Sequence, residues 1–184
     1  MSCDNCCKKS NKSVKDYIIT IPDFPKEGIM FRDVTGILQD AEGFQLAVDE
    51  MAKLVDPSEV DAFAGAEARG FVFASVLSYL FHKPLVLIRK KGKLPRETVS
   101  ASYALEYGTA EIEVNKDAIC PGQKIVIVDD LLATGGTGKA CAEVVEKLGG
   151  KVSKIIYLLE LAGLNGRELL SGYDVGSVVS YEGK

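Results

Sequence analysis

The sequence holds a single histidine, His82, among 184 residues, and this scarcity excludes most catalytic schemes that depend on imidazole. No apolar stretch is long enough to cross a bilayer and the N-terminus is polar, so we expect neither a membrane helix nor a secretory signal. Positive charge is not in excess either, because 22 Lys and Arg face 26 Asp and Glu, which gives a net charge of −4. We therefore expect a cytoplasmic protein with no general affinity for nucleic acid or membranes.

Cysteine is sparse, with five residues, and an odd number in a chain without a secretory signal favours reduced thiols. Three of them, Cys3, Cys6 and Cys7, resemble half of a zinc site, but no second pair stands at metal-ligand spacing. Palmitoylation is a further alternative, although no membrane-facing helix supports it. We interpret residues 1–12 as a flexible polar tail.

The remaining residues, 13–184, predict one α/β domain, because 47% apolar and 26% charged residues are typical of an ordinary globular chain. Strand-like runs alternate with helical patterns, which predicts a doubly wound, mostly parallel sheet flanked by helices. The helical stretch 71–81 is apolar nearly all round, so we expect the sheet and a second subunit to cover it, as in a homodimer.

The most informative stretch runs from Lys124 to Thr137. Ile125–Val128 is entirely β-branched and predicts a strand buried on both faces. Two acids, Asp129 and Asp130, follow it, and then a Thr- and Gly-rich turn leads into a helix. Such a turn suits a phosphate, whereas adjacent acids suit sugar hydroxyls or a metal. The pattern indicates a sugar phosphate held at both its hydroxyls and its phosphate.

A nucleoside-triphosphate P-loop is the nearest alternative, since Gly138 and Lys139 follow the turn. That motif requires Gly five positions before its second Gly, and Ser or Thr after its Lys. Ala133 and Ala140 stand at those positions, so both requirements fail.

Two further strand ends carry phosphate-suited chemistry. Arg69 lies in a turn between a strand and a helix, where its guanidinium can offer several donors to phosphate oxygens, although a plain surface Arg is equally compatible with the sequence. The run Arg89-Lys90-Lys91-Gly92-Lys93 follows another buried strand and concentrates positive charge in an acidic chain, although such runs are usually solvated surfaces. Alternation at Ala110–Val114 then predicts a hairpin arm, with Glu111 and Glu113 on its solvated face.

The segment Val128-Asp129-Asp130-Leu131-Leu132-Ala133-Thr134-Gly135-Gly136-Thr137 resembles the phosphoribosyl pyrophosphate motif of the type I phosphoribosyltransferases. Its Leu-Leu-Ala-Thr-Gly-Gly-Thr form is similar to that of the adenine-using members. The resemblance extends from about Ile21 to Arg167 and implies a small N-terminal hood at about residues 21–36 and a mobile catalytic loop at about 94–113. It also implies a cis peptide bond between Glu67 and Ala68.

The resemblance assigns a role to each candidate site residue. Asp129 and Asp130 would bind the ribose, and the 5′-phosphate would bind Ala133, Thr134, Gly135, Gly136 and Thr137. Pyrophosphate would bind Arg69, Arg89, Lys90, Lys93 and Tyr107. Adenine would bind Met30, Phe31, Arg32 and Leu161, with Glu106 as the catalytic carboxylate over the base.

The implied reaction is transfer of the 5-phosphoribosyl group from phosphoribosyl pyrophosphate to adenine, which gives AMP and pyrophosphate in purine salvage. Mg²⁺ would be held mainly by the pyrophosphate group and water, without direct protein ligands. Two alternatives remain: the same chemistry on hypoxanthine, guanine or orotate, and a regulator that keeps the fold but binds RNA or DNA. The second requires an additional basic surface, which the sequence does not offer outside the candidate site.

Overall fold

The computed structural model describes residues 12–104 and 109–183. The chain divides into two compact units, Met1–Leu46 and Ala47–Lys184. Within the described ranges, no helix combines the length and the apolar character needed to span a membrane.

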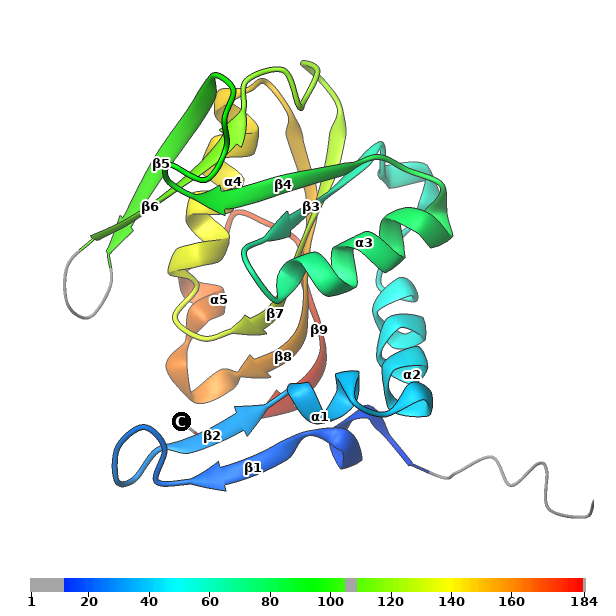
Figure 1. Cartoon of the computed structure of the whole chain (residues 1–184), viewed down its shortest axis with the longest axis vertical. Coiled ribbons are helices and arrows are strands. Elements are labelled where there is room, and N and C mark those ends of the chain that lie inside the picture. The colour runs from blue at the N-terminus through cyan, green and yellow to red at the C-terminus, as the bar shows by residue number, and fades with distance from the viewer. Residues whose placement is uncertain (1–11, 105–108, 184) are drawn as a thin grey trace, which may run out of the picture. The chain divides into compact units, whose positions relative to one another are not determined.

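The larger unit is built on a seven-stranded sheet (Figure 1). Its strands are, in order across the sheet, β5 (Thr98–Ala104), β6 (Thr109–Asn115), β4 (Leu85–Lys90), β3 (Ala62–Ala66), β7 (Lys124–Leu132), β8 (Lys151–Leu161) and β9 (Val175–Tyr181). The five strands from β4 to β9 in this order are parallel, β6 pairs antiparallel with β4, and β5 pairs antiparallel with β6. The predicted mostly parallel α/β sheet is confirmed.

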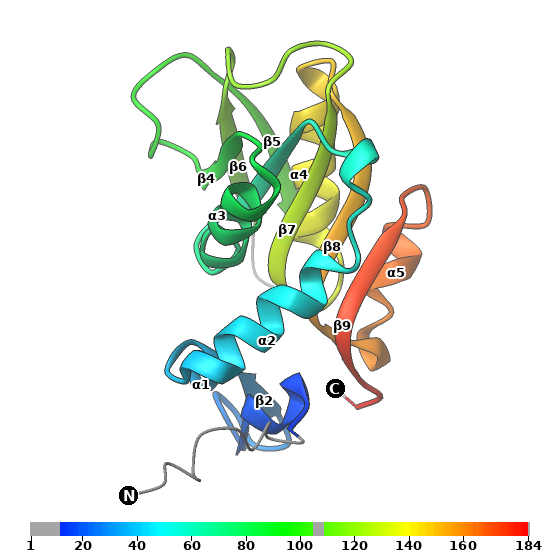
Figure 2. The same ribbon diagram turned by 90° about the vertical axis from the view of Figure 1, so that its right-hand side faces the viewer.

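Helices α3 (Gly70–Phe81) and α4 (Gly136–Lys147) lie on opposite faces of this sheet, as Figures 1 and 2 show. The shorter helical segments are η2 (Pro57–Glu59), η3 (Ala162–Leu164) and α5 (Gly166–Leu169). Helix α2 (Ala41–Ala52) continues from the smaller unit into the larger one.

Strand β7 forms the centre of the core, as its β-branched run predicts. Ile125–Val128 are at most 2% exposed. Ile125 and Ile127 belong to one hydrophobic cluster with Ala140 and Cys141 of α4. Because alternate residues of a strand point to opposite faces, Val126 and Val128 face the side that carries α3. Burial on both faces explains why this strand contains no polar residue between Lys124 and Asp129.

The smaller unit contains an antiparallel hairpin. Its elements are η1 (Val14–Tyr17), β1 (Ile19–Pro22), β2 (Met30–Asp33) and α1 (Thr35–Leu38). Ile21 of β1 pairs with Phe31 of β2. Phe24 in the connecting turn contacts Phe31 edge to face, with ring centroids 5.1 Å apart. The predicted division of the chain, with a hood at about 21–36 in one domain at 13–184, stays a prediction.

Residues 98–104 and 109–115 are more regular than the sequence suggests, since β5 and β6 pair along seven residues from Thr98↔Asn115 to Ala104↔Thr109. The predicted arm is therefore present, but the expectation for its outer face is partly wrong. Glu113 is 3% exposed, not solvated, because backbone N–H groups and a hydroxyl surround its carboxylate.

Candidate active site

Three loops that carry predicted site residues, those after β3, β4 and β7, leave the sheet at one edge. Gly65 of β3 stands beside Val128 of β7, and Ala66 stands beside Ile88 of β4, all in parallel register. The carboxyl ends of these strands therefore meet at the same edge, which is where open α/β sheets bind ligands.

The loop where β7 passes into α4 has the backbone geometry of an anion-binding helix start. Gly135 takes a left-handed backbone conformation, φ 85°, which a glycine adopts readily, and α4 begins at Gly136. The first turn of this helix directs its backbone N–H groups and the positive end of its dipole toward the loop. Gly166 of α5 packs directly behind the loop, because a Cβ there would come within 2.3 Å of the Ala133 carbonyl oxygen.

The paired acids stand next to this loop and close to Arg69. Asp130 is 5% exposed and forms an ion pair with the Nε atom of Arg69. The backbone N–H of Asp130 donates to Oδ1 of Asp129 over 2.9 Å. Desolvation, followed by the nearby charge of Asp130, raises the pKa of Asp129 well above its ordinary value. The structure thus brings Arg69, Asp129 and Asp130 together, as the sequence predicts.

The basic run Arg89–Lys93 is only partly available to a ligand. Arg89 donates to the carboxylate of Glu67, with its Nε 3.2 Å from Oε2, and also to the carbonyl oxygen of Lys93. Lys91 forms an ion pair with Glu111.

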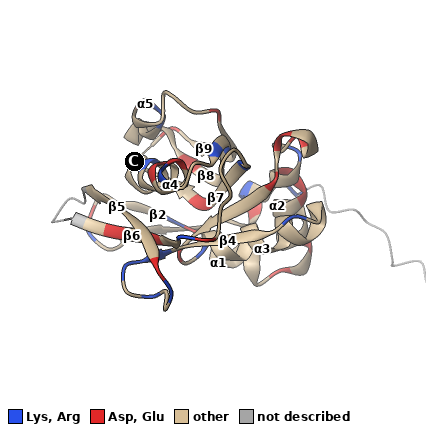
Figure 3. Cartoon of the chain, turned by 90° about the horizontal axis from the view of Figure 1, so that it is seen from above, with Lys and Arg blue, Asp and Glu red and all other residues tan. Residues whose placement is uncertain are grey.

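Lys90 and Lys93 are exposed cations of this run that form no ion pair with an acid in the described residues. Neither has a carboxylate within 4.0 Å among the residues that the structure describes. Figure 3 shows Lys and Arg along the loop that leaves β4. This loop therefore presents unneutralised ammonium groups near the edge where an anion would bind.

Glu67 is a site residue to which the sequence assigns no role. Its carboxylate accepts the backbone N–H of Lys90 over 2.9 Å in addition to the guanidinium of Arg89. Burial would raise the pKa of Glu67, but these hydrogen bonds outweigh burial and leave the pKa lowered. The peptide bond that follows, Glu67–Ala68, is cis, and the expectation for it is confirmed.

The Glu160–Arg167 pair also escapes prediction from the sequence. Glu160 is 6% exposed, and Arg167 donates to its two carboxylate oxygens over 2.7 Å each. Ser177 donates to the same carboxylate over 2.7 Å, so α5 is tied to both β8 and β9. The available signal was an acid directly after the buried apolar run Ile155–Leu159, where only a paired charge is tolerated.

For several predicted site residues the described structure tests no role. Glu106 and Tyr107 lie outside the described residues. Met30, Phe31 and Arg32 belong to the smaller unit, where the Arg32 guanidinium donates to the Thr20 hydroxyl. Leu161 ends β8 and is half-buried. Their roles toward a base stay predictions.

Asp129 and Asp130 are the adjacent pair of possible metal ligands that the site offers. Among residues 12–104 and 109–183, no group of three or more His, Cys, Asp or Glu side chains could hold a metal ion. The hard oxygen atoms of Asp129 and Asp130 suit Mg²⁺, which commonly binds one or two carboxylates together with substrate phosphates and water.

Three features come together at this edge: two acids near the end of a buried strand, a glycine turn at a helix start, and cationic loops. Together they define a site of the phosphoribosyl-transferring class. The sequence model described as the phosphoribosyl transferase domain matches residues 34–178. An adenine phosphoribosyltransferase of Agathobacter rectalis is 65% identical over 94% of this chain and 99% of its own length.

Solved structures agree with this result. The adenine phosphoribosyltransferase of Thermoanaerobacter pseudethanolicus has a TM-score of 0.87 and 50% identity, over 91% of this chain and 98% of that one. The Saccharomyces cerevisiae enzyme, solved in complex with an imino-altritol bisphosphate and adenine, has a TM-score of 0.86 and 35% identity, over 90% and 96% of the two chains. The chain belongs to the adenine phosphoribosyltransferase family.

Proposed function

We propose that this chain transfers the 5-phosphoribosyl group of phosphoribosyl pyrophosphate to adenine and releases AMP and pyrophosphate. The observation that carries the proposal is the gathering of an anion-binding helix start, two acids and two cationic loops at one sheet edge. Full-length similarity to adenine phosphoribosyltransferases supports adenine as the acceptor rather than another base.

In the proposed reaction a bond forms between a ring nitrogen of adenine and C1′ of the ribose while the bond from C1′ to pyrophosphate breaks. Positive charge develops on the sugar as the leaving group departs. Asp129 and Asp130 bind the ribose hydroxyls and stabilise that charge. Residues 133–137 hold the 5′-phosphate with backbone N–H groups, which fixes C1′ relative to the incoming base.

The leaving pyrophosphate is stabilised by Arg69, Arg89, Lys90 and Lys93, with Tyr107 beside them in the proposal. Arg69 pairs with Asp130 in this structure, so the guanidinium must turn from the carboxylate to the substrate when the sugar occupies the acid. Lys90 and Lys93 meet no such competition from the described acids. Mg²⁺, which family enzymes generally use with the phosphoribosyl donor, would neutralise further charge on the pyrophosphate, and Asp129 and Asp130 offer oxygen donors compatible with it.

For the acceptor, we propose that Met30, Phe31, Arg32 and Leu161 bind adenine and that Glu106 hydrogen bonds to the base or accepts its proton. The proposed hood at about 21–36 and the mobile loop at about 94–113 carry most of these groups. Exclusion of water is the expected benefit of such segments, because water would otherwise hydrolyse the donor.

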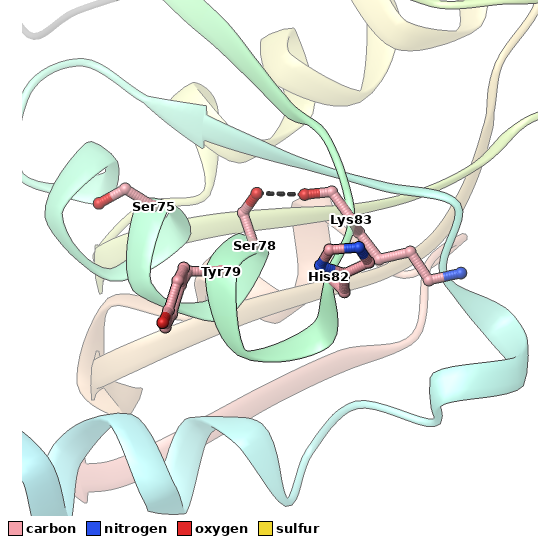
Figure 4. Close-up of a pocket in the computed structure, with 5 residues that line it drawn as sticks. All are labelled: Ser75, Ser78, Tyr79, His82 and Lys83. Atoms are coloured by element: carbon pink, nitrogen blue, oxygen red, sulfur yellow. Dashed lines mark hydrogen bonds between the residues drawn. The ribbon is translucent and has the colours of Figure 1, made fainter.

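The proposed assembly is a homodimer that buries the outer face of α3. Tyr79 and Leu80 on this helix are 84% and 53% exposed, although the helix is almost entirely apolar. Figure 4 shows a hollow on the same face, lined by Ser75, Ser78, Tyr79, His82 and Lys83. His82 ends the helix in a left-handed conformation, consistent with a structural role. Replacing Leu80 with Arg should shift the mass measured by light scattering toward a monomer.

The decisive experiment combines purified protein with phosphoribosyl pyrophosphate, Mg²⁺ and one base at a time. We expect AMP from adenine, and turnover at least about a hundredfold lower with hypoxanthine, guanine or orotate. A site that hydrogen bonds to the polar groups of one base leaves buried groups unpaired when it binds another. Glu106→Ala should lower kcat far more than it lowers the melting temperature. Absence of AMP together with salt-sensitive RNA binding would instead favour the regulator.

A further inference from the structure

Glu113 on β6 is a buried carboxylate for which the proposed mechanism has no use. Its side chain is 3% exposed. Oε1 accepts the backbone N–H groups of Lys93 and Leu94, each over 2.9 Å, and Oε2 accepts the hydroxyl of Thr98 over 3.1 Å. Burial would raise the pKa of Glu113, but these hydrogen bonds outweigh burial and leave the pKa lowered, so the group is a carboxylate at neutral pH.

The two backbone bonds hold the middle of the loop between β4 and β5, at Lys93 and Leu94. The start of the loop is held by Glu67, whose Oε2 accepts the backbone N–H of Lys90 over 2.9 Å. Between the two anchors the chain turns at Gly92, which has φ 81°. Both carboxylates therefore bind the main chain of the basic loop, while the ammonium groups of Lys90 and Lys93 stay exposed.

We propose that Glu113 is a positioning residue for the pyrophosphate end of the donor. By holding the backbone at Lys93 and Leu94 it fixes the place from which the Lys93 side chain reaches the anion. The inference rests on the proposed function, in which Lys93 faces pyrophosphate. It goes beyond that function, because it gives Glu113 on β6 a part in the affinity of the loop between β4 and β5 for pyrophosphate.

This role predicts that removal of Glu113 changes anion affinity in the direction opposite to the one expected from its charge alone. A negative charge beside a pyrophosphate site repels the ligand, so removal of the charge alone should tighten anion binding. If Glu113 acts through the backbone, its removal should instead weaken binding, because the loop loses the bonds that order it.

Three substitutions of Glu113 distinguish the effect of its backbone hydrogen bonds from the effect of its charge. Glu113→Ala removes the hydrogen bonds and the charge. Glu113→Asp keeps the charge but is one methylene too short to make the same hydrogen bonds. We expect each to raise the KM for phosphoribosyl pyrophosphate, and the inhibition constant of inorganic pyrophosphate, by about tenfold or more, as expected for the loss of two backbone hydrogen bonds. Glu113→Gln keeps an acceptor oxygen in place without the charge, so both constants should stay within about threefold of wild type.

Glu111→Gln is the matched control. It removes a charge two residues away on β6, but Glu111 binds the side chains of Lys91 and Ser100 rather than the loop backbone at Lys93. Its donor KM should not rise. The KM for adenine should stay within about twofold in every variant, since uniform changes would indicate general damage rather than positioning.

The proposal is overturned if folded Glu113→Ala and Glu113→Asp bind donor and pyrophosphate as well as wild type or better. It is also overturned if the KM values of both substrates and kcat deteriorate together with the melting temperature. If Glu113→Ala does not fold, Glu113→Asp decides. Failure of wild type to make AMP would refute the proposed function, whereas an active wild type with unshifted variants refutes the role of Glu113 alone.

Discussion

Replacement of Arg167 with Ala should destabilise the larger unit measurably, because it leaves the buried carboxylate of Glu160 without its main partner. Arg167 donates two bonds of 2.7 Å to Glu160 and one of 2.7 Å to the Val175 carbonyl. Breaking a fully buried pair costs about 3–5 kcal/mol. Arg167 is 48% exposed, so water replaces part of the lost interaction and we expect about 2–3 kcal/mol.

A loss of that size corresponds to a fall of about 4–12 °C in melting temperature for a chain of this length. Differential scanning calorimetry and urea unfolding at pH 7 measure it. Arg96→Ala is the matched control, since the Arg96–Asp117 pair is 60% and 65% exposed and should contribute less than about 1 kcal/mol. A melting temperature for Arg167→Ala within about 1 °C of wild type would refute the reasoning.

The pH dependence gives a second test of the same pair. The hydrogen bonds from Arg167 are the largest cause that lowers the pKa of Glu160 in the folded protein. A lowered folded pKa means that the stabilisation is complete above the unfolded pKa of about 4.3 and is lost as pH falls through the folded pKa. The difference in unfolding free energy between wild type and Arg167→Ala should therefore be largest at neutral pH and shrink in acid.

Three further predictions follow from the site. Asp129→Asn should raise the melting temperature at pH 7, because the raised pKa of Asp129 means that its charge disfavours folding as pH rises. Its kcat/KM should fall by more than about a hundredfold, and an unchanged rate contradicts the role of the acid. Gly166→Ala should raise the KM for phosphoribosyl pyrophosphate about tenfold, since a Cβ would push on Ala133, whereas Gly172→Ala, with nothing within 4 Å, should not. Lys93→Gln should raise the same KM about tenfold and Lys91→Gln should leave it nearly unchanged, because Lys91 is engaged by Glu111. Equal effects of the two lysine variants would count against the assignment of Lys93.

Those parts of the site that are formed by consecutive residues of one short segment could be predicted from the sequence. Ile125–Val128, Asp129, Asp130 and the glycine turn are consecutive, so their strand, acids and helix start could be predicted together. The proximity of Asp130 to Arg69 was also predictable, because parallel strands bring their carboxyl ends to one edge.

The buried acids could not be predicted in the same way. Glu113 alternates with Glu111 like any residue of a solvated face, and its burial depends on Lys93, Leu94 and Thr98, 15–20 residues away along the chain. The partner of Glu160 likewise comes from α5, beyond the end of the strand. A charge is recognisable as buried only when the groups that satisfy it are known, and local patterns do not contain those groups.

The common edge of the parallel strands also bears on how the protein refolds. The loops that carry Arg69, Lys93 and Gly135 are distant in sequence, and they follow strands whose carboxyl ends come together only when β3, β4 and β7 pair. Pairing of parallel strands closes long loops, and the entropy cost of closure precedes the favourable contacts between the strands. Such sheets therefore form slowly. Affinity for phosphoribosyl pyrophosphate should therefore return late in refolding, after most helical signal. The donor, which binds only the assembled edge, should stabilise the native state by about 2.7 kcal/mol at a hundred times its Kd.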